Sequence, residues 1–467
     1  MDYRKFLSAG VVVLLGAWCA HGNGDVTRLD DAFSVAVSDA AAYSQPAVSL
    51  SDRQQEAFRR GRAGFKRPWV VFGISTGDWG LGPTFVAESC DACHADLGRG
   101  VLPRSANAQP VSMVVRVSVP GSGSHGGPHP LAHYGEQLQN RALQGQKHEL
   151  LFTYEPIPAE AELYITWEEL SVTLPDGTQA GLRRPQLSIE NPSFGDLPAN
   201  TMTSLRIAPP VFGLGLLEAV PEESLHELAR RQRALGFNGR PNFARDEINA
   251  RTVLTRFGWK ATQPNLRQQI AAAAIHDMGV TSSLFPRQNC PDAQKQCRRE
   301  VPGNDPELSD AAWDDLELHL LGLAAPAARN LAAPEVQRGA ALFDQLQCAV
   351  CHVPELRTAD YFPRLPQLSR QTVRAYTDLL LHDMGEGLAD HRPDFAAGGR
   401  DWRTPPLWGL GLSKTVNGSG VLLHDGRARN VMEAILWHGG EALRSRNAFA
   451  ALSKADRDAL VAFVNAI

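Results

Sequence analysis

The pattern CxxCH occurs twice in this chain, as CDACH at residues 90–94 and as CAVCH at residues 348–352. Two thiols three residues apart lie on one helical turn, where each can add to one vinyl group of a haem, and the histidine that follows reaches the iron. A structural zinc site needs four ligands, usually from two neighbouring knuckles, whereas more than half of the chain separates these pairs. A dithiol redox motif would need a βαβ context and no trailing histidine. The sequence therefore predicts two covalently attached c-type haems, with attachment at Cys90, Cys93, Cys348 and Cys351 and iron ligation by His94 and His352.

The N-terminal segment indicates export. Arg4 and Lys5 precede the apolar run FLSAGVVVLLGAW, and the small residues Ala20 and Gly22 follow at suitable positions for cleavage. Residues 1–22 are therefore predicted to be a removed signal peptide, with a buried N-terminal helix as the alternative. The apolar run is short for a membrane span and no other segment qualifies, so we expect a periplasmic mature chain without a span.

Composition limits the classes of function. The 467 residues, 43% hydrophobic and 21% charged, are typical of an ordinary globular protein with two or three domains. The net charge of -5 and the lack of a basic run argue against nucleic acid as a partner. An oxidising compartment favours a local disulfide between Cys290 and Cys297, with two free thiols as the alternative.

The flanks of the two CxxCH motifs indicate an internal duplication. Gly339 and Phe343 precede the second motif, and Gly61 and Phe65 precede the first with the same mutual spacing. We therefore predict a mainly α chain with two cytochrome c-like haem domains, at residues 50–330 and 335–467, separated by an Ala/Pro-rich boundary. The C-terminal helix predicted in LSKADRDALVAFVNAI is expected to pack against the first helix of its domain.

Residues of about 105–210 have a different character. VSMVVRVSV, at residues 111–119, alternates with period two, as a strand does. ELYITWEELSVTLPDGTQAGLRR indicates two strands around a Pro-Asp-Gly turn. The N-terminal haem domain is therefore predicted to carry a β-rich insertion, to which the sequence assigns no chemistry.

Several longer motifs surround the haem sites. TDLLLHDMGEGLAD, WRTPPLWGLGL and LLHDGRARNVMEAILWHGGEA follow the second CxxCH, while GLGLLEAV and RFGWKATQPNLRQQIAAAAIHDMG lie between the two. With these motifs the chain resembles the di-haem oxidoreductases, c-type peroxidase-like relatives of the bacterial di-haem cytochrome c peroxidases and of the di-haem enzyme that matures a tryptophan-derived cofactor. The resemblance covers nearly everything after residue 50.

The resemblance implies a second axial ligand for the C-terminal haem. In relatives this ligand lies fourteen residues after the histidine of a His-x-Gly motif; here that histidine is His424 and the ligand position is His438. The implied bis-His haem is low-spin and lower in potential than a His/Met haem. The alternative is that His438 only ends a helix beside Gly439. Arg403, in WRTPPL, is expected to pair with a haem propionate, because a guanidinium suits a carboxylate.

The resemblance also implies roles near the N-terminal haem. The tetrapeptide His-Asp-Met-Gly occurs at 276–279 and again at 382–385. In the first copy, Asp277 stands where relatives have the glutamate that cleaves peroxide, and we interpret the second copy as structural. Trp259 falls near the aromatic residue that lies between the haems in relatives, with plain core packing as an equal alternative.

The sequence therefore predicts a peroxidase that reduces peroxide at the N-terminal haem with electrons relayed through the C-terminal haem. A small donor protein such as a cytochrome c or a cupredoxin is the expected partner. Two alternatives stay open. One is an electron carrier in which Met278 or His276 ligates the first iron, and the other is an oxidase that modifies a partner protein.

Overall fold

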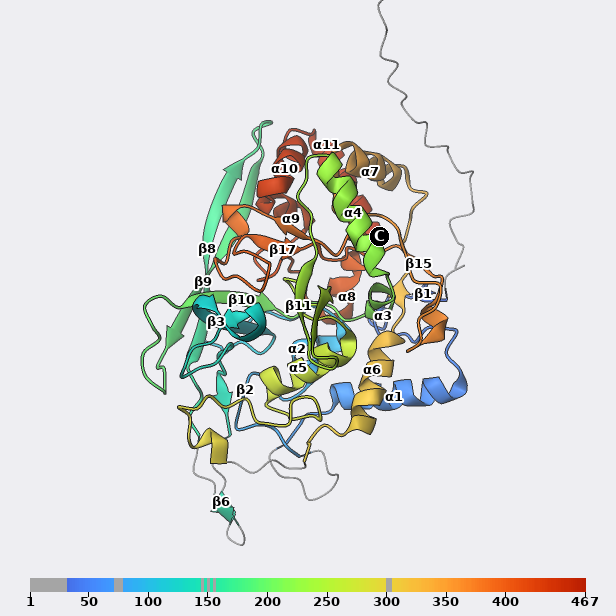
Figure 1. Cartoon of the computed structure of the whole chain (residues 1–467). Coiled ribbons are helices and arrows are strands. Elements are labelled where there is room, and N and C mark those ends of the chain that lie inside the picture. The colour runs from blue at the N-terminus through green and yellow to red at the C-terminus, as the bar shows by residue number, and fades with distance from the viewer. Residues whose placement is uncertain (1–31, 71–78, 144–146, 149–151, 154–156, 300–304) are drawn as a thin grey trace, which may run out of the picture.

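The computed structural model describes residues 32–70, 79–143, 147–148, 152–153, 157–299 and 305–467 (Figure 1). The predicted signal peptide lies outside these residues. None of the described helices is long and apolar enough to cross a membrane. The α-helices are α1 (Asp52–Lys66), α2 (Cys90–Cys93), α3 (Leu214–Glu218), α4 (Glu222–Ala234), α5 (Leu266–Met278), α6 (Asp310–Leu321), α7 (Pro334–Gln345), α8 (Ser413–Asn417), α9 (Val431–Trp437), α10 (Leu443–Ala450) and α11 (Lys454–Ala466).

The strands form small sheets. Most are two-stranded, and the three-stranded sheet has the order β10-β3-β4. The strands are β1 (Ser34–Val35), β2 (Thr84–Phe85), β3 (Met113–Ser122), β4 (Pro128–His129), β5 (Arg141–Ala142), β6 (Lys147–His148), β7 (Phe152–Thr153), β8 (Glu162–Thr173), β9 (Gln179–Glu190), β10 (Met202–Ile207), β11 (Asn242–Asp246), β12 (Arg251–Thr255), β13 (Ala325–Pro326), β14 (Leu356–Arg357), β15 (Thr372–Val373), β16 (Leu381–Asp383) and β17 (Asp401–Arg403).

The prediction of a mainly α chain with two cytochrome c-like domains is wrong. Helical residues make up 32% of the structure and strand residues 21%, in 11 helices and several small sheets among the described residues. The helices predicted from capping signals do form, with Ser51, Ser309 and Ser453 as N-caps. Between them, however, the chain runs mostly through loops and short strands, which helical periodicity does not reveal.

Two helix pairs repeat the same close packing. A Cβ atom built on Gly61 of α1 would lie 2.0 Å from the carbonyl oxygen of Asp315 in α6. A Cβ atom on Gly339 of α7 would lie 2.0 Å from the carbonyl oxygen of Ala459 in α11. Only glycine allows this approach of two helix backbones. The glycine repeat in the sequence therefore corresponds to a repeat in structure, and the C-terminal helix packs as expected.

The phenylalanine four residues after each glycine extends this repeat. Phe65 lies with its ring centroid 6.3 Å from that of His94, at an interplanar angle of 52°. Phe343 lies 6.4 Å from His352, at 56°. The first helix of each pair thus presents an aromatic ring to the histidine of its CxxCH motif in nearly the same way.

The segment at 105–210 contributes both a sheet and a long hairpin. β3 covers most of the strand predicted from alternation, and its odd-numbered side chains, Met113, Val115 and Val117, are 0% exposed. Burial of each such side chain stabilises the fold by about 2 kcal/mol. β8 and β9 pair antiparallel over their whole length and run beside α9 and α10 of the C-terminal half in Figure 1. Arg183 of β9 donates to the carbonyl oxygens of Gly426 and Arg427, so the hairpin ties the two halves together.

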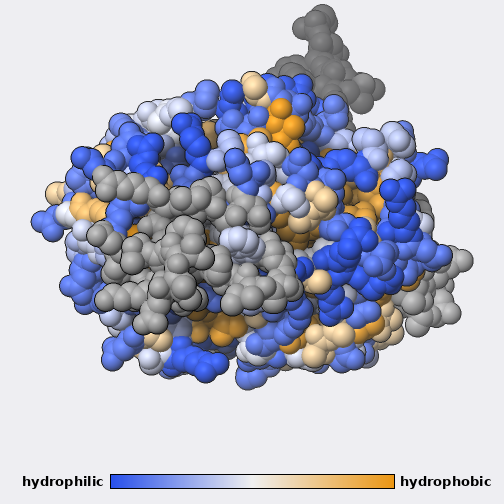
Figure 2. Space-filling view, turned by 90° about the horizontal axis from the view of Figure 1, so that it is seen from below, coloured by the Kyte–Doolittle hydropathy of each residue, from blue (hydrophilic) through white to orange (hydrophobic). Residues whose placement is uncertain are grey.

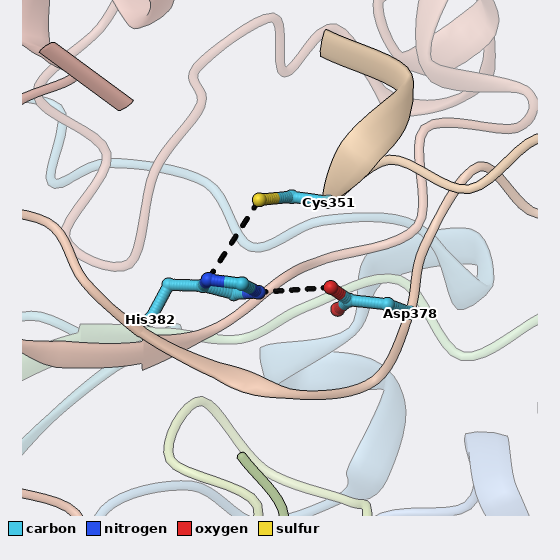
Figure 3. Close-up of side chains that lie close together, drawn as sticks. All are labelled: Cys351, Asp378 and His382. Carbon is cyan, nitrogen blue, oxygen red and sulfur yellow. Dashed lines mark hydrogen bonds and ion pairs between the residues drawn. The ribbon is translucent and has the colours of Figure 1, made fainter. Parts of the chain in front are cut away.

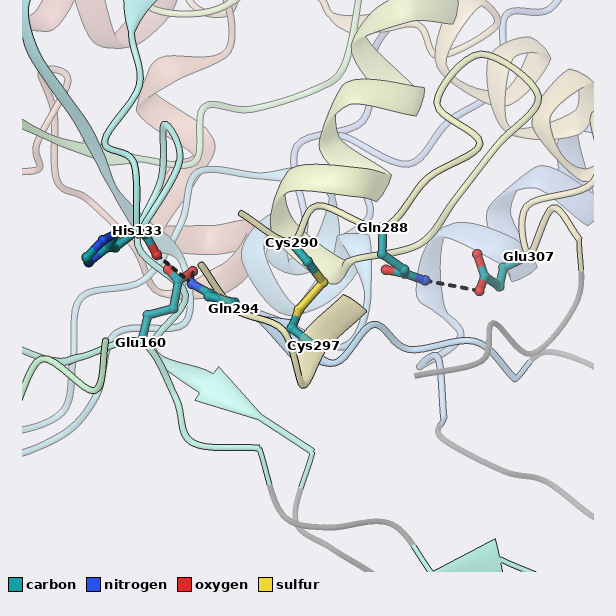
Figure 4. The surroundings of a disulfide bond; sticks show 7 residues. All are labelled: His133, Glu160, Gln288, Cys290, Gln294, Cys297 and Glu307. Carbon is teal, nitrogen blue, oxygen red and sulfur yellow. Dashed lines mark hydrogen bonds between the residues drawn. A yellow bond between two sulfur atoms is a disulfide. The ribbon is translucent and has the colours of Figure 1, made fainter. Parts of the chain in front are cut away.

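The predicted disulfide between Cys290 and Cys297 is present (Figure 4). Between the two cysteines, Gln294 donates hydrogen bonds to the Glu160 carboxylate, at 2.6 Å, and to the carbonyl oxygen of His133, at 2.9 Å. The disulfide loop, which follows α5, is therefore attached to the β-rich segment.

Hydrophilic residues dominate the face of the molecule seen in Figure 2, where hydrophobic patches are small and separate among the described residues. This pattern is typical of a surface that faces water.

Candidate functional site

Each CxxCH motif opens into its own cavity. The first cavity is lined by Cys90, Cys93 and His94 and holds about 1810 Å³ of space between atoms, part of it open to solvent. The second cavity is lined by Cys348, Cys351 and His352 and holds about 1360 Å³. Apolar side chains make up most of both linings, as is usual for cofactor sites.

The first CxxCH motif is positioned by a capped helical turn. Ser89 accepts a hydrogen bond from the backbone N–H of Ala92 and starts α2. The Nδ1 atom of His94 lies 2.6 Å from the carbonyl oxygen of Pro209, which leaves Nε2 for a metal ion. Burial lowers the pKa of His94 to about 4, so the imidazole is neutral, as an iron ligand must be. Burial also raises the pKa of the Cys90 thiol to about 12.

Two of the four histidines that line the second cavity have matching surroundings. The Nδ1 atom of His352 lies 3.0 Å from the carbonyl oxygen of Tyr376, and the Nδ1 atom of His438 lies 2.7 Å from that of Ala434. Burial, reinforced by the charge of His438, lowers the pKa of His352 to about 4. His438 ends α9 and also lines the cavity. Its interpretation as a helix end is therefore compatible with its interpretation as an iron ligand.

The two His-Asp-Met-Gly copies have different surroundings. In the first copy, at the end of α5, Asp277 and Met278 line the first cavity. The Nε2 atom of Gln137 donates to Oδ1 of Asp277 at 2.9 Å and to the carbonyl oxygen of His276. Burial raises the pKa of Asp277 above its usual value, although the nearby Arg116 partly opposes this. His276 contacts Asn289 at 3.3 Å and is absent from the lining of the first cavity.

In the second copy, His382 forms a polar cluster at the edge of the second cavity (Figure 3). Its Nε2 atom lies 2.8 Å from Asp378, and its Nδ1 atom lies 3.1 Å from Glu441 and 3.7 Å from Sγ of Cys351. Burial disfavours the charged ring, but the two carboxylates outweigh it and raise the pKa of His382 well above its usual value. Cys351, Asp378 and His382 are close enough to bind a metal ion, but a thioether at Cys351 would remove the thiolate that such a site needs.

A sequence model of the family described as "Di-haem oxidoreductase, putative peroxidase" matches residues 22–467. The chain belongs to this di-haem oxidoreductase family. No curated protein and no solved structure matches it. The resemblance noted in the sequence is thus confirmed, and membership makes the chain an oxidoreductase whose cofactors are haems.

Haem carries propionates, and the di-haem oxidoreductase offers two buried cations where the two cavities meet. Arg99 and Arg403 line both cavities and are only 6% and 7% exposed. Among the described residues neither guanidinium has a carboxylate within salt-bridge distance; Arg403 donates to the carbonyl oxygen of Gly258 and Arg99 to that of Leu423. Burial lowers the pKa of both side chains to about 10. Buried charges need partners, so these residues fit a haem whose propionates enter here.

Trp259 lies between the two cavities and lines both. Its indole N–H donates to the carbonyl oxygen of Ile207 at 2.8 Å, and the guanidinium of Arg99 lies 5.4 Å from its ring centroid. Trp259 is also part of a hydrophobic cluster, so the core-packing interpretation and the inter-haem position are compatible.

Sequence reasoning missed Arg99 and Gln137. Arg99 follows the first CxxCH motif closely, whereas no local signal marks Gln137.

Proposed function

We propose that this di-haem oxidoreductase is an exported peroxidase that reduces peroxide in the first cavity with electrons relayed through the second. The observation that supports this most directly is the contrast between the cavities. The first cavity is lined by one histidine, His94, with a carboxylate, Asp277. The second is lined by four histidines, and in two of them, His352 and His438, Nδ1 lies on a carbonyl oxygen and no described residue binds Nε2. The first iron, held by His94, would thus keep a coordination position for peroxide. The second iron would be held by both His352 and His438.

The thioether bonds to the four CxxCH cysteines are part of the proposal, as are His94, His352 and His438 as iron ligands. Bound haem would supply the redox chemistry, in which a peroxide takes two electrons and two protons and becomes water and a second hydroxyl product. Arg99 and Arg403 would each hold a propionate, which fixes the haem edges on either side of Trp259. Trp259 would then be the contact through which electrons pass from the second cavity to the first.

The role of Asp277 is to move a proton. A carboxylate beside the bound peroxide takes the proton from the near oxygen and returns it to the far oxygen, which leaves as water or alcohol. Gln137 holds the Oδ1 atom of Asp277, so the other oxygen stays available for the proton. Burial raises the pKa of this carboxyl, which brings it closer to the pH at which it must both accept and donate.

The electron donor in this proposal is a small periplasmic protein such as a cytochrome c or a cupredoxin. Its electrons would enter at the second cavity, where His352 and His438 would hold the haem that receives them.

The decisive experiment compares two substitutions of the same residue type in the same tetrapeptide. Asp277→Asn removes the proton carrier from the first cavity and should lower peroxide turnover at least 100-fold, with normal haem content. Asp383→Asn is the control: Asp383 pairs with Arg400 at 2.5 Å, is partly exposed and lines neither cavity itself. Full turnover in Asp277→Asn would remove this residue from the mechanism.

Met278 also lines the first cavity. This position favours one alternative, an electron carrier in which protein side chains ligate both irons and no peroxide binds. Electron paramagnetic resonance of the oxidised, half-reduced and fully reduced protein distinguishes the two functions. The peroxidase should show a high-spin ferric signal from the first haem in at least one of these states. Only low-spin ferric signals in both the oxidised and the half-reduced protein would contradict the peroxidase.

A further inference from the structure

Arg116 faces the first cavity from the β-rich segment, where its charge acts on the nearby carboxyls of Asp277 and Glu136 without a direct ion pair among the described residues. It lies on β3, where side chains alternate between the two faces of the sheet. The odd-numbered residues of this strand enter the hydrophobic core, whereas Ser112, Val114 and Arg116 line the first cavity. The guanidinium of Arg116 is half-buried and forms no ion pair or hydrogen bond with the residues that the structure describes.

The backbone of Arg116 is paired with that of Gln137 in an antiparallel bridge. Side chains that face each other in such a pair lie on the same side of the sheet, a few ångströms apart. Since Gln137 donates to Asp277, this pairing brings the guanidinium to the same side as the carboxylate. The Oε1 atom of Gln137 is buried and also lacks a partner among the described residues. A cation and a carboxylate therefore line one wall of the first cavity, and Gln137, which binds the carboxylate, lies behind the lining residues.

A smaller outer cavity, of about 800 Å³, leads to this wall. It shares five lining residues with the first cavity: Arg116, Arg206, Thr262, Gln263 and Ala272. The other arginines of the outer cavity are paired, Arg206 and Arg392 with Asp394 and Arg245 with Glu247. Among the described arginines that line both the first and the outer cavity, Arg116 is thus the one without a direct ion pair, so its donors can reach a ligand.

We infer that Arg116 binds the exogenous ligand of the first haem, a small anion or a peroxide that enters through the outer cavity. The inference rests on the proposed function, since it requires an iron position open to ligands. Negative charge develops on the far oxygen as the O–O bond breaks, before Asp277 has delivered its proton to that oxygen. A guanidinium beside that oxygen stabilises the charge by a charge-assisted hydrogen bond.

The test is ligand binding by the ferric holoprotein, followed by haem absorbance at mildly alkaline pH. Azide is an anion under these conditions, and imidazole is mostly neutral. Arg116→Gln should weaken azide binding by about tenfold to a hundredfold, the loss of one charge-assisted hydrogen bond, and leave imidazole binding nearly unchanged. Arg116→Lys, which keeps the charge but loses the fork of donors, should weaken azide binding severalfold. Arg245→Gln removes a paired charge from the outer cavity and should bind azide as the wild type does.

Equal azide affinity in Arg116→Gln and the wild type would overturn the inference, as would an equal loss of azide and imidazole binding. A shift of the haem potential without a change in azide affinity would indicate that Arg116 binds a haem propionate. This result would also overturn the inference. If the glutamine variant does not accumulate with haem, the lysine variant replaces it in the test. An azide affinity in Arg116→Lys equal to that of the wild type would then overturn the inference. A wild-type protein that binds neither azide nor imidazole would overturn the proposed function together with the inference.

Discussion

The glycine at the crossing of α1 and α6 allows a quantitative test of how the first haem site is supported. A Cβ atom on Gly61 would lie 2.0 Å from the carbonyl oxygen of Asp315 and 2.7 Å from the Cβ atom of His319. Carbon and oxygen atoms normally stay about 3.3 Å apart, so Gly61→Ala must push the helices apart by about 1 Å. Neither blocking atom is the end of a flexible side chain, so the backbone itself must move.

Two opposing effects set the size of the loss. Alanine is about 1 kcal/mol better than glycine inside a helix. Overpacking of this kind costs about 1–3 kcal/mol, and a gap of about 1 Å along the crossing forfeits up to half of the dispersion energy of the contacts it opens. The net effect of Gly61→Ala is therefore expected to be a destabilisation of about 1–2 kcal/mol.

Gly64, one turn further along α1, is the matched control. A Cβ atom on Gly64 would lie 3.6 Å from a side-chain atom of Leu316, an ordinary contact. Gly64→Ala keeps the helix-propensity gain without the clash, so we expect the free energy of unfolding to rise by up to about 1 kcal/mol. Both variants keep the capping box formed by Ser51 and Gln54 at the start of α1.

The assay is denaturant or thermal unfolding of the haem-loaded protein, with haem absorbance recorded in parallel. Gly61→Ala should unfold at a lower denaturant concentration than the wild type, and Gly64→Ala at the same or a higher one. Because Phe65 of the same helix contacts His94, the spectrum of the first haem should change in Gly61→Ala only. A Gly61→Ala protein as stable as Gly64→Ala would refute the reasoning, since it would show that the two helices are free to separate.

Three further predictions concern a buried carboxyl, the disulfide and the second haem. Burial raises the pKa of Glu160 to about 8, so the folded state binds its proton more tightly than the unfolded state does. The stabilisation from this proton is complete below the ordinary pKa of a glutamate and is lost as the pH rises through about 8. Glu160→Gln should flatten this part of the curve of unfolding free energy against pH. An unchanged curve would contradict the raised pKa of Glu160. Replacing both Cys290 and Cys297 by serine opens a short loop and should cost about 2 kcal/mol of unfolding free energy, measured by denaturation; no loss would show that the loop is held by its other contacts. His438→Met should raise the reduction potential of the second haem in a redox titration, because a His/Met iron has a higher potential than a bis-His iron; an unchanged potential would exclude His438 as a ligand.

The candidate site was predictable from the sequence where its residues act through neighbours in the chain. The CxxCH motifs, the disulfide and the N-cap serines depend on contacts within a few residues, so spacing alone reveals them. The resemblance pointed to Asp277, Trp259, Arg403 and His438, and the structure places all four on the linings of the two cavities. The fold class was predicted wrongly because the duplicated helix pairs dominate the sequence signal, while the loops and short strands between them leave little periodicity.

By itself, the sequence determined that two CxxCH motifs lie in a duplicated framework and that the chain is a di-haem oxidoreductase. Only the tertiary structure decided which side chains meet around each motif. Gln137 reaches Asp277 across 140 residues of sequence, and Arg99 donates to Leu423 across 324. These contacts come from packing between distant segments, and the composition and spacing of a segment carry no record of which distant segment will cover it.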